Sequence, residues 1–231
     1  MAGNKTTEEI HFTIEKDNSD VSSLAGTSWD TTTGQPLKDS KTVYLWHLDE
    51  DGNEVSGEVS LESYTATTGG LGNGNASYVS SQNTIPVDFS ETNAYTVEFW
   101  QKGTGKGLEI SKSDQFSCDT SYSGSNCSGS IYNYYKTSSG SQTRNGFGSP
   151  YIDASTWHYW AFTYNGKYAA IYCDGVLVSF NEMNIELFSN ENKLDISSNG
   201  KGNYDEICIS NAARSGDEIA AYYKAAKDKI Q

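Results

Sequence analysis

Carboxylates are the commonest groups in this sequence that could take part in catalysis, but their spacing does not favour it. The chain holds 30 Asp and Glu residues against 16 Lys and Arg. A glycoside hydrolase needs two carboxyl groups on one face, flanking the bond that breaks. The densest acidic group, residues 49–54, contains Gly52 and Asn53 and must turn, and no predicted strand carries a Glu-x-Asp-x-x-Glu pattern. We therefore expect a protein without enzymatic activity.

The histidines also do not indicate an enzyme. The chain has only His11, His47 and His158. A nucleophilic enzyme places a base beside a serine or cysteine nucleophile, often in a motif such as Gly-x-Ser-x-Gly. None of the three histidines belongs to such a motif. No catalytic triad is predicted.

The four cysteines fall into two kinds. Cys118 and Cys127 bracket the segment CDTSYSGSNC, where a disulfide would close a short hairpin and add about 2–3 kcal/mol by restricting the unfolded chain. Cys173 and Cys208 lie within apolar runs and are expected to be buried thiols, with their redox state left open. We expect a Cys118–Cys127 disulfide in an oxidising environment. No Cys-x-x-Cys spacing occurs, so no zinc site is predicted.

Aromatic and amide side chains gather in the segment SIYNYYKTSSGSQTRNGF in a way that suits sugar binding. Apolar sugar faces stack on aromatic rings, while sugar hydroxyls need directional hydrogen-bond partners. The alternative is that alternate tyrosines cover the core. An exposed platform is also predicted at the tryptophan opposite the apolar face of Val97 and Phe99. The predicted ligand-binding residues are Trp100, Tyr132, Asn133, Tyr134, Tyr135, Arg144 and Asn145.

Charge and hydropathy exclude two classes of partner. The formal net charge of −14 repels phosphate backbones and anionic lipid head groups, and no basic patch stands apart. Residues 224–229 alternate Lys with Ala and Asp at helical spacing, which is typical of a solvated helix face. No apolar run reaches the roughly 18 residues of a membrane span. We expect neither nucleic-acid binding nor membrane insertion.

Short strands must position these groups, because the composition favours β-structure: 22 Gly and 16 Tyr occur with only 3 Pro. Apolar alternation predicts strands within residues 43–48, 95–100, 158–164, 169–180 and 205–210. Asp174-Gly175 is the hairpin turn of the fourth run. Ser215 and Glu218 form a capping box that opens an amphipathic helix over residues 216–230.

Residues 1–40 are expected to form an N-terminal arm that precedes a domain of residues 41–231. Ile10, Phe12 and Ile14 alternate with polar residues and predict one strand in this arm. The amino terminus lacks the apolar core of a signal peptide. We take Met1 as the natural start, which favours release in a phage particle by lysis over loss of an upstream signal.

Four segments, taken in order, resemble the laminin G-like, pentraxin-related branch of the concanavalin A-type jelly rolls. They are YLWHLDEDG, YTVEFWQK, STWHYWAFTYNGKYAAIYCDGVLV and YDEICISNAARSGDEIAAYY, and the resemblance covers residues 42–225. It implies an all-β fold: a concanavalin A-like jelly-roll β-sandwich of two antiparallel sheets with a short C-terminal helix. It also implies a structural role for His158, at the Trp-His step that enters a strand.

The resemblance further implies a structural Ca²⁺ held by Asp49 and Asp205. In the family, an acidic residue after the first strand and another at the start of the last strand come together at such an ion. Backbone carbonyls near Gly52 and Asn53 would add ligands, since calcium takes six to eight oxygens. The alternative is that these acids are ordinary turn residues of a very acidic protein.

Because this fold hosts lectins, adhesion modules, hydrolases and structural proteins, its presence does not decide the function. We expect a non-catalytic recognition module that binds carbohydrate or a surface glycoprotein, displayed on a phage virion or outside a cell. One alternative is a structural decoration protein that contacts neighbouring virion proteins through the arm. Another is a carbohydrate-binding module from a bacterial adhesin or glycosidase.

Overall fold

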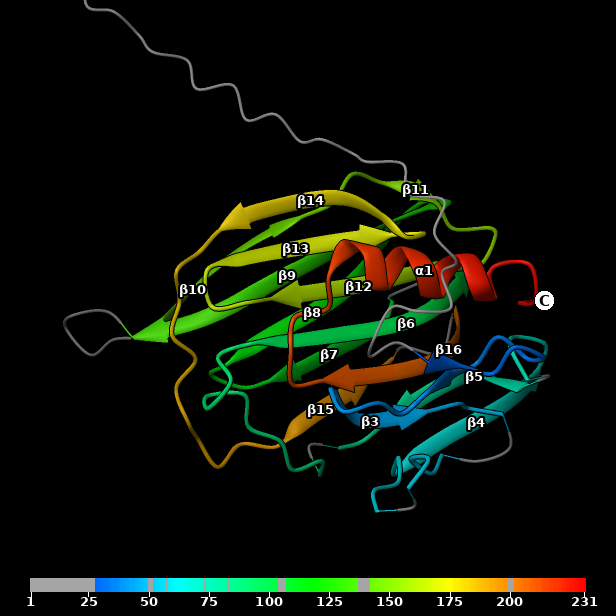
Figure 1. The fold of residues 1–231 in the computed structure, drawn as a ribbon, viewed down its shortest axis with the longest axis horizontal. Coiled ribbons are helices and arrows are strands. Elements are labelled where there is room, and N and C mark those ends of the chain that lie inside the picture. Colours follow the sequence, from blue (N-terminus) through cyan, green and yellow to red (C-terminus); the bar gives the residue numbers. More distant parts are fainter. Residues whose placement is uncertain are drawn as a thin grey trace, which may run out of the picture.

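A computed structural model describes residues 28–49, 52–56, 58–72, 74–82, 84–103, 107–136, 142–198 and 202–231 (Figure 1). The predicted arm strand around Phe12 lies outside these residues. Residues 28–40, which were also assigned to the arm, hold two short strands, and Trp29 packs against the C-terminal helix. Within the described ranges, no helix combines the length and apolar character that crossing a membrane requires.

The described residues form short strands followed by one helix. The first eight strands are β1 (Ser28–Trp29), β2 (Pro36–Leu37), β3 (Thr42–Trp46), β4 (Ser63–Thr68), β5 (Gly74–Ser80), β6 (Tyr95–Gly103), β7 (Glu109–Lys112) and β8 (Phe116–Ser123). The remaining elements are β9 (Asn126–Lys136), β10 (Gln142–Gly148), β11 (Ile152–Asp153), β12 (His158–Tyr164), β13 (Tyr168–Cys173), β14 (Val176–Glu182), β15 (Leu194–Ser197), β16 (Gly202–Ser210) and α1 (Gly216–Ala226).

The strands stack in two antiparallel layers (Figure 1). The front layer runs β14-β13-β12-β6-β16, with β3 also on β16, and the back layer runs β10-β9-β8-β7-β15. Strand β5 joins the two, because Ser80 pairs with Ser197 of β15 and Ala76 pairs with Tyr204 of β16. β4 pairs with β5, and β11 pairs with β9. This arrangement confirms the predicted sandwich.

The core lies between the layers, where alternate residues of each strand point inward. Tyr95, Val97 and Phe99 of β6 are all fully buried on this side. The Tyr95 ring stacks on Phe116 of the back layer with 4.4 Å between centroids, and Phe99 stacks on Phe162 of β12. Burying each large apolar side chain contributes about 1.5–3 kcal/mol, so this interior holds the layers together.

Helix α1 covers the outer face of the front layer (Figure 1). The predicted capping box is confirmed: the Glu218 amide donates to Ser215 Oγ, and the Glu218 carboxylate accepts from the Ser215 amide. Ile219 and Tyr222 form the buried face of the helix. Strand β6 is therefore buried on both faces along most of its length.

The prediction of an exposed platform at Trp100 is wrong. Its side chain is 1% exposed, its ring lies 5.3 Å from that of Tyr159, and its indole N–H donates to the Tyr222 hydroxyl at 3.2 Å. Trp100 does point away from the sandwich core, as the alternation of β6 requires. Helix α1, rather than solvent, occupies that face.

The predicted Cys118–Cys127 disulfide is also wrong, since both residues are buried free thiols. In the β8–β9 hairpin Cys118 pairs with Ile131, whereas Cys127 pairs with Tyr122. The two cysteines are thus four residues out of register, roughly 13 Å along the strands, beyond the reach of a disulfide. Cys173 is a buried free thiol, as expected.

Candidate functional site

Two of the predicted tyrosines share the outer face of the back layer. Along β9, Ile131 and Asn133 point inward, so Tyr132 and Tyr134 point outward and are half-buried. Tyr132 pairs with Ser117 of β8 on one side and with Gly146 of β10 on the other. This face, in which large rings stand beside small residues, forms a shallow groove of about 300 Å³.

Arg144 completes the groove. It lies on β10 and pairs with Tyr134 of β9, and its guanidinium lies over the Tyr132 ring, 4.5 Å from the centroid. Gly146 lets the ring lie flat, because a Cβ at Gly146 would come within 2.0 Å of Tyr132 Cδ1. Stacking on a guanidinium holds an aromatic ring in one orientation. The structure therefore brings Tyr132, Tyr134 and Arg144 together, as the sequence predicted.

Hydroxyls and carboxylates that the sequence did not single out line the same groove. Glu109 of β7 lies directly opposite Asp119 of β8, and Ser117 and Ser121 add hydroxyls. An aromatic ring beside such groups matches the needs of a sugar, which stacks one face and directs its hydroxyls to polar partners. Glu109 and Asp119 lie ten residues apart across a hairpin, so only strand register pairs them.

The other predicted ligand residues lie elsewhere. Asn133 is fully buried and its side-chain oxygen accepts a hydrogen bond from the Tyr95 hydroxyl at 2.6 Å, so the prediction that it binds a ligand is wrong. Tyr135 and Asn145 line a separate groove of about 670 Å³, next to the segment 183–189. Lys136 lies over the Phe188 ring there. The β9–β10 hairpin thus separates the predicted cluster into two grooves.

The two predicted metal ligands meet at one segment, residues 70–72 and 74. Asp205 Oδ2 accepts the Leu71 amide at 2.7 Å, and Asp49 Oδ1 accepts the Gly74 amide at 3.2 Å. A Cβ at Gly70 would lie 2.5 Å from Asp205 Oδ2, so the backbone closes tightly around this carboxylate. The residues adjacent to Asp49 at positions 50 and 51 lie outside the described residues.

Glu206, which the sequence did not indicate, adds a third carboxylate. It lies beside Asp205 at a bulge of β16, with φ of +53°, and is 2% exposed. Its Oε2 lies 2.6 Å from His47 Nδ1, and its buried Oε1 has no hydrogen-bond partner among the described residues. Strained backbone of this kind is found at functional sites.

Asp49, Asp205 and Glu206 together form an acidic site, and the described residues around it supply too little positive charge to balance three ionised carboxylates. Burial, and then the charge of Glu206, raise the pKa of Asp205 well above its ordinary value. Burial also raises the pKa of Glu206 and lowers that of His47. Among the described residues, the hydrogen bonds and ion pairs to Asp205 and Glu206 include none from Lys or Arg. The oxygen donors fit a hard cation such as Ca²⁺.

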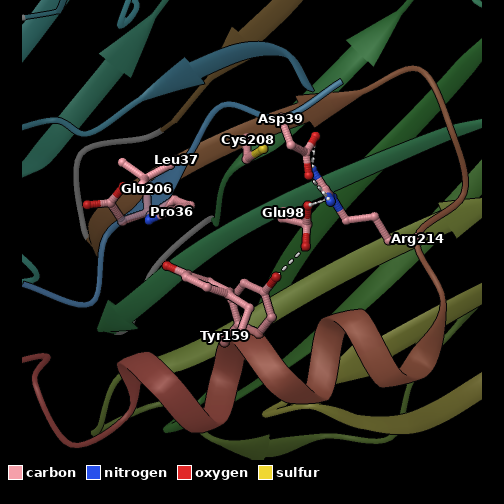
Figure 2. A pocket seen from close by; sticks show the side chains of 9 residues that line it. Pro36, Leu37, Asp39, Glu98, Tyr159, Glu206, Cys208 and Arg214 are labelled. Atoms are coloured by element: carbon pink, nitrogen blue, oxygen red, sulfur yellow. Dashed lines mark hydrogen bonds and ion pairs between the residues drawn. The ribbon is translucent and has the colours of Figure 1, made fainter. Parts of the chain in front are cut away.

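A third polar cluster lies under helix α1, and Figure 2 shows Arg214 between Asp39 and Glu98. The guanidinium is bidentate to Asp39 at 2.8 and 3.1 Å and lies 2.9 Å from Glu98, which also accepts from the Tyr159 hydroxyl. The cavity at this cluster measures about 20 Å³, space for about one water molecule. This cluster is structural, because no sugar fits there.

Comparison with solved structures shows the same fold in proteins with little sequence similarity. The binding domain of Paraclostridial Mosquitocidal Protein 1 matches at a TM-score of 0.56 and 15% identity, covering 79% of this chain and 52% of that one. The binding domain of Botulinum Neurotoxin DC, solved in complex with SialylT, matches at 0.53 and 14%, covering 81% and 52%. The chain thus spans about half the length of these toxin domains.

Domain 4 of AbnA, an extracellular GH43 arabinanase of Geobacillus stearothermophilus solved with arabinotriose, matches at a TM-score of 0.58 and 14% identity. That match covers 80% of this chain and 99% of the other. No curated protein matches the sequence. A laminin G domain model, described as the concanavalin A-like lectin/glucanases superfamily, matches residues 73–220. The chain therefore belongs to the laminin G-like family of the concanavalin A-like lectin/glucanase superfamily.

Proposed function

We propose that this module binds a glycan in the groove on the outer face of its back layer. The observation that carries the proposal is the Tyr132 ring, held flat by Arg144 and bordered by Ser117, Glu109 and Asp119. Similarity in fold to a sugar-complexed arabinanase domain and to a toxin binding domain supports the choice of ligand class. The Tyr132 ring would stack on one sugar face, while the polar border would select its hydroxyls.

The proposal is tested by screening the full chain on a glycan array and measuring the best ligand by calorimetry. Tyr132→Ala removes the stacking ring and is expected to raise the Kd at least about tenfold. This change corresponds to a loss of roughly 1.4 kcal/mol of binding free energy. Tyr168→Ala is the matched control, because Tyr168 is a 39% exposed tyrosine of the front layer. Binding lost in Tyr135→Ala but kept in Tyr132→Ala would assign the ligand to the other groove.

We propose that binding takes place without hydrolysis. Two of the similar solved structures are described as binding domains, which supports this choice. Glu109 and Asp119, which face one another across two strands, are the pair that a retaining glycosidase would use, since it needs carboxyl groups about 5–5.5 Å apart. Incubating the bound glycan with excess protein, and analysing it by mass spectrometry, is expected to return it intact. Cleavage that disappears in Glu109→Gln would show that the groove is an active site.

Calcium is proposed as a structural ion of the acidic site, held by Asp49, Asp205 and Glu206. The unpartnered, buried Glu206 Oε1 supports this assignment. The ion would neutralise the carboxylates and join β16 to the segment that contains Leu71 and Gly74. At 100 times its Kd, Ca²⁺ would stabilise the fold by about 2.7 kcal/mol. Asp205→Asn should abolish the shift in Tm that calcium produces, whereas Asp228→Asn, at an exposed position, should not.

The setting we propose is a virion or cell surface, where a glycan-binding module meets its ligand. An exposed apolar pair on β14 also supports a structural role in an assembly: Leu177 and Phe180 are 47% and 59% exposed and line the same groove. Single apolar residues on a surface are common, but exposed apolar side chains that share one groove are typical of a protein contact. The test is to quantify this protein by mass spectrometry in purified virus particles and in the particle-free culture medium. Enrichment in the particles would indicate a virion protein, and enrichment in the medium would indicate a secreted one.

A further inference from the structure

A mixed cluster of metal-ligating side chains lies at one rim of the sandwich, away from the glycan groove. It consists of His158 at the start of β12, and Cys173 and Asp174 at the end of β13. Strand register brings them together, since Trp160 pairs with Cys173. One ligand atom from each of the three lies within 4.8 Å of the others.

The hydrogen bonds of His158 leave a place for a cation. Its Nε2 lies 2.6 Å from the Asp153 carbonyl and 3.3 Å from Thr156 Oγ1. A carbonyl only accepts, so Nε2 must carry a proton. Nδ1 faces Asp174 Oδ2 at 2.7 Å, and this contact needs a positive charge between them. Either a second proton on the ring or a metal ion supplies it.

The Asp153 carbonyl accepts a hydrogen bond from the ring nitrogen of His158 that would not bind the metal. Histidine ligands commonly donate their other ring N–H to a carbonyl or carboxylate, which fixes the tautomer and the ring orientation. Here that bond orients Nδ1 toward Asp174, the neighbour of Cys173 in the cluster. The Tyr159 amide in turn holds the second Asp174 oxygen at 2.9 Å.

A second cysteine faces the cluster from the back layer. Gly129 of β9 lies against Trp160, because a Cβ there would come within 2.9 Å of the tryptophan ring. Cys127 lies two residues earlier on the same inward face of β9 and pairs with Ile152 of β11. The next residue of β11, Asp153, is the one whose carbonyl contacts His158, so Cys127 lies near the cluster. Cys127 and Cys173 are both buried.

The two thiols are protonated unless a cation binds. Burial, followed by the charges of Asp153 and Asp174, raises the pKa of Cys127 to about 11. Burial, followed by the charge of Asp174, raises the pKa of Cys173. Binding of a metal ion releases the protons of its thiol ligands.

We infer that His158 Nδ1, Cys173 Sγ, Asp174 and Cys127 Sγ bind a divalent transition-metal ion of the zinc class, which joins the two layers. Nitrogen and sulfur ligands favour zinc over calcium, and four ligands satisfy a tetrahedral structural site. The ion displaces one proton from each thiol and any proton on Nδ1, and no bond in the protein breaks. Side-chain exposures of 14% for His158 and 29% for Asp174 leave a path for entry.

The test uses the full chain, reduced, stripped with a chelator and titrated anaerobically with Co²⁺ and then Zn²⁺. We expect one equivalent of Co²⁺ to bind with a thiolate-to-cobalt absorption band that Zn²⁺ bleaches. Cys173→Ser keeps the side-chain size and should weaken binding roughly 100-fold. Cys208→Ser is the matched control, a buried cysteine at the Arg214 cluster, and should bind like the parent chain.

Other readouts separate the alternatives. Cys127→Ser should reduce the thiolate band by about half, since one of two sulfur ligands is lost; an unchanged band would remove Cys127 from the site. No thiolate band with reduced protein, or equal binding by Cys173→Ser, would overturn the proposal. A Cys127–Cys173 disulfide in air, in a protein whose reduced form binds no metal, would also overturn it. Asp205→Asn should leave cobalt binding intact, which keeps this site distinct from the acidic one.

Discussion

Replacing Arg214 with methionine should destabilise the protein more than a substitution that removes an exposed charged side chain. Arg214 is 6% exposed and lies between Asp39 and Glu98, whose side chains are 8% and 7% exposed. Removing the cation leaves two buried carboxylates without their counter-charge. Breaking a buried ion pair in this way costs about 3–5 kcal/mol.

The loss in free energy is measured by urea unfolding and the change in Tm by thermal unfolding, each followed by circular dichroism and by tryptophan fluorescence. At about 2–4 °C per kcal/mol for a chain of this size, the Tm should fall by roughly 6–20 °C. Lys167→Ala is the matched control, because its ion pair with Glu182 is 3.9 Å long and more than half exposed at both ends. That variant should lose less than about 1 kcal/mol.

A second variant isolates the cause. Arg214→Met combined with Glu98→Gln removes one of the stranded charges and should recover part of the loss, since Tyr159 can donate to a glutamine oxygen as well. If Arg214→Met alone unfolds within about 1 kcal/mol of the parent chain, the reasoning from buried charge is refuted.

Further predictions follow from close contacts and from titration. Gly129→Ala should cost about 1–3 kcal/mol in urea unfolding, because the new Cβ would lie 2.9 Å from Phe162 Cε1. Gly146→Ala should weaken glycan binding and also lower the Tm, because the new Cβ would lie 2.0 Å from Tyr132 Cδ1 and 2.6 Å from the Ile131 carbonyl oxygen; unchanged affinity would count against the groove. Burial alone would raise the pKa of Asp39, but the guanidinium described above lowers it below 3.8. Its stabilisation should therefore be present above about pH 4 and be lost as the pH falls further, and an Asn variant should flatten this part of the acid-unfolding curve.

The strands were largely predictable because their signal is local. Alternation over residues 158–164 matches β12, and the runs at residues 43–48 and 95–100 fall within a few residues of β3 and β6. The predicted turn at Asp174-Gly175 has positive φ at both positions. The helix begins at the predicted Gly216 and ends at Ala226, four residues earlier than expected. Period-two patterning and capping act between neighbours in sequence, so they need no knowledge of the fold.

The candidate site was predictable only in part. Tyr132 and Tyr134 share one face of β9, and the same alternation, counted from apolar Ile131, would have placed Asn133 and Tyr135 on the other face. Trp100 was correctly placed on the outer side of β6, but the helix that covers it begins more than 100 residues later. Sequence pattern determines which way a side chain points, and packing determines what it meets.

By itself, the sequence determined the β-sandwich class, the strand faces, the closing helix and the family, because each depends on patterns carried within short segments. Tertiary structure alone decided which distant groups meet: Glu109 with Asp119, Glu206 with His47, and Cys127 with Ile152. The physical reason is that antiparallel register and layer packing bring together residues whose separation in sequence carries no trace of their contact.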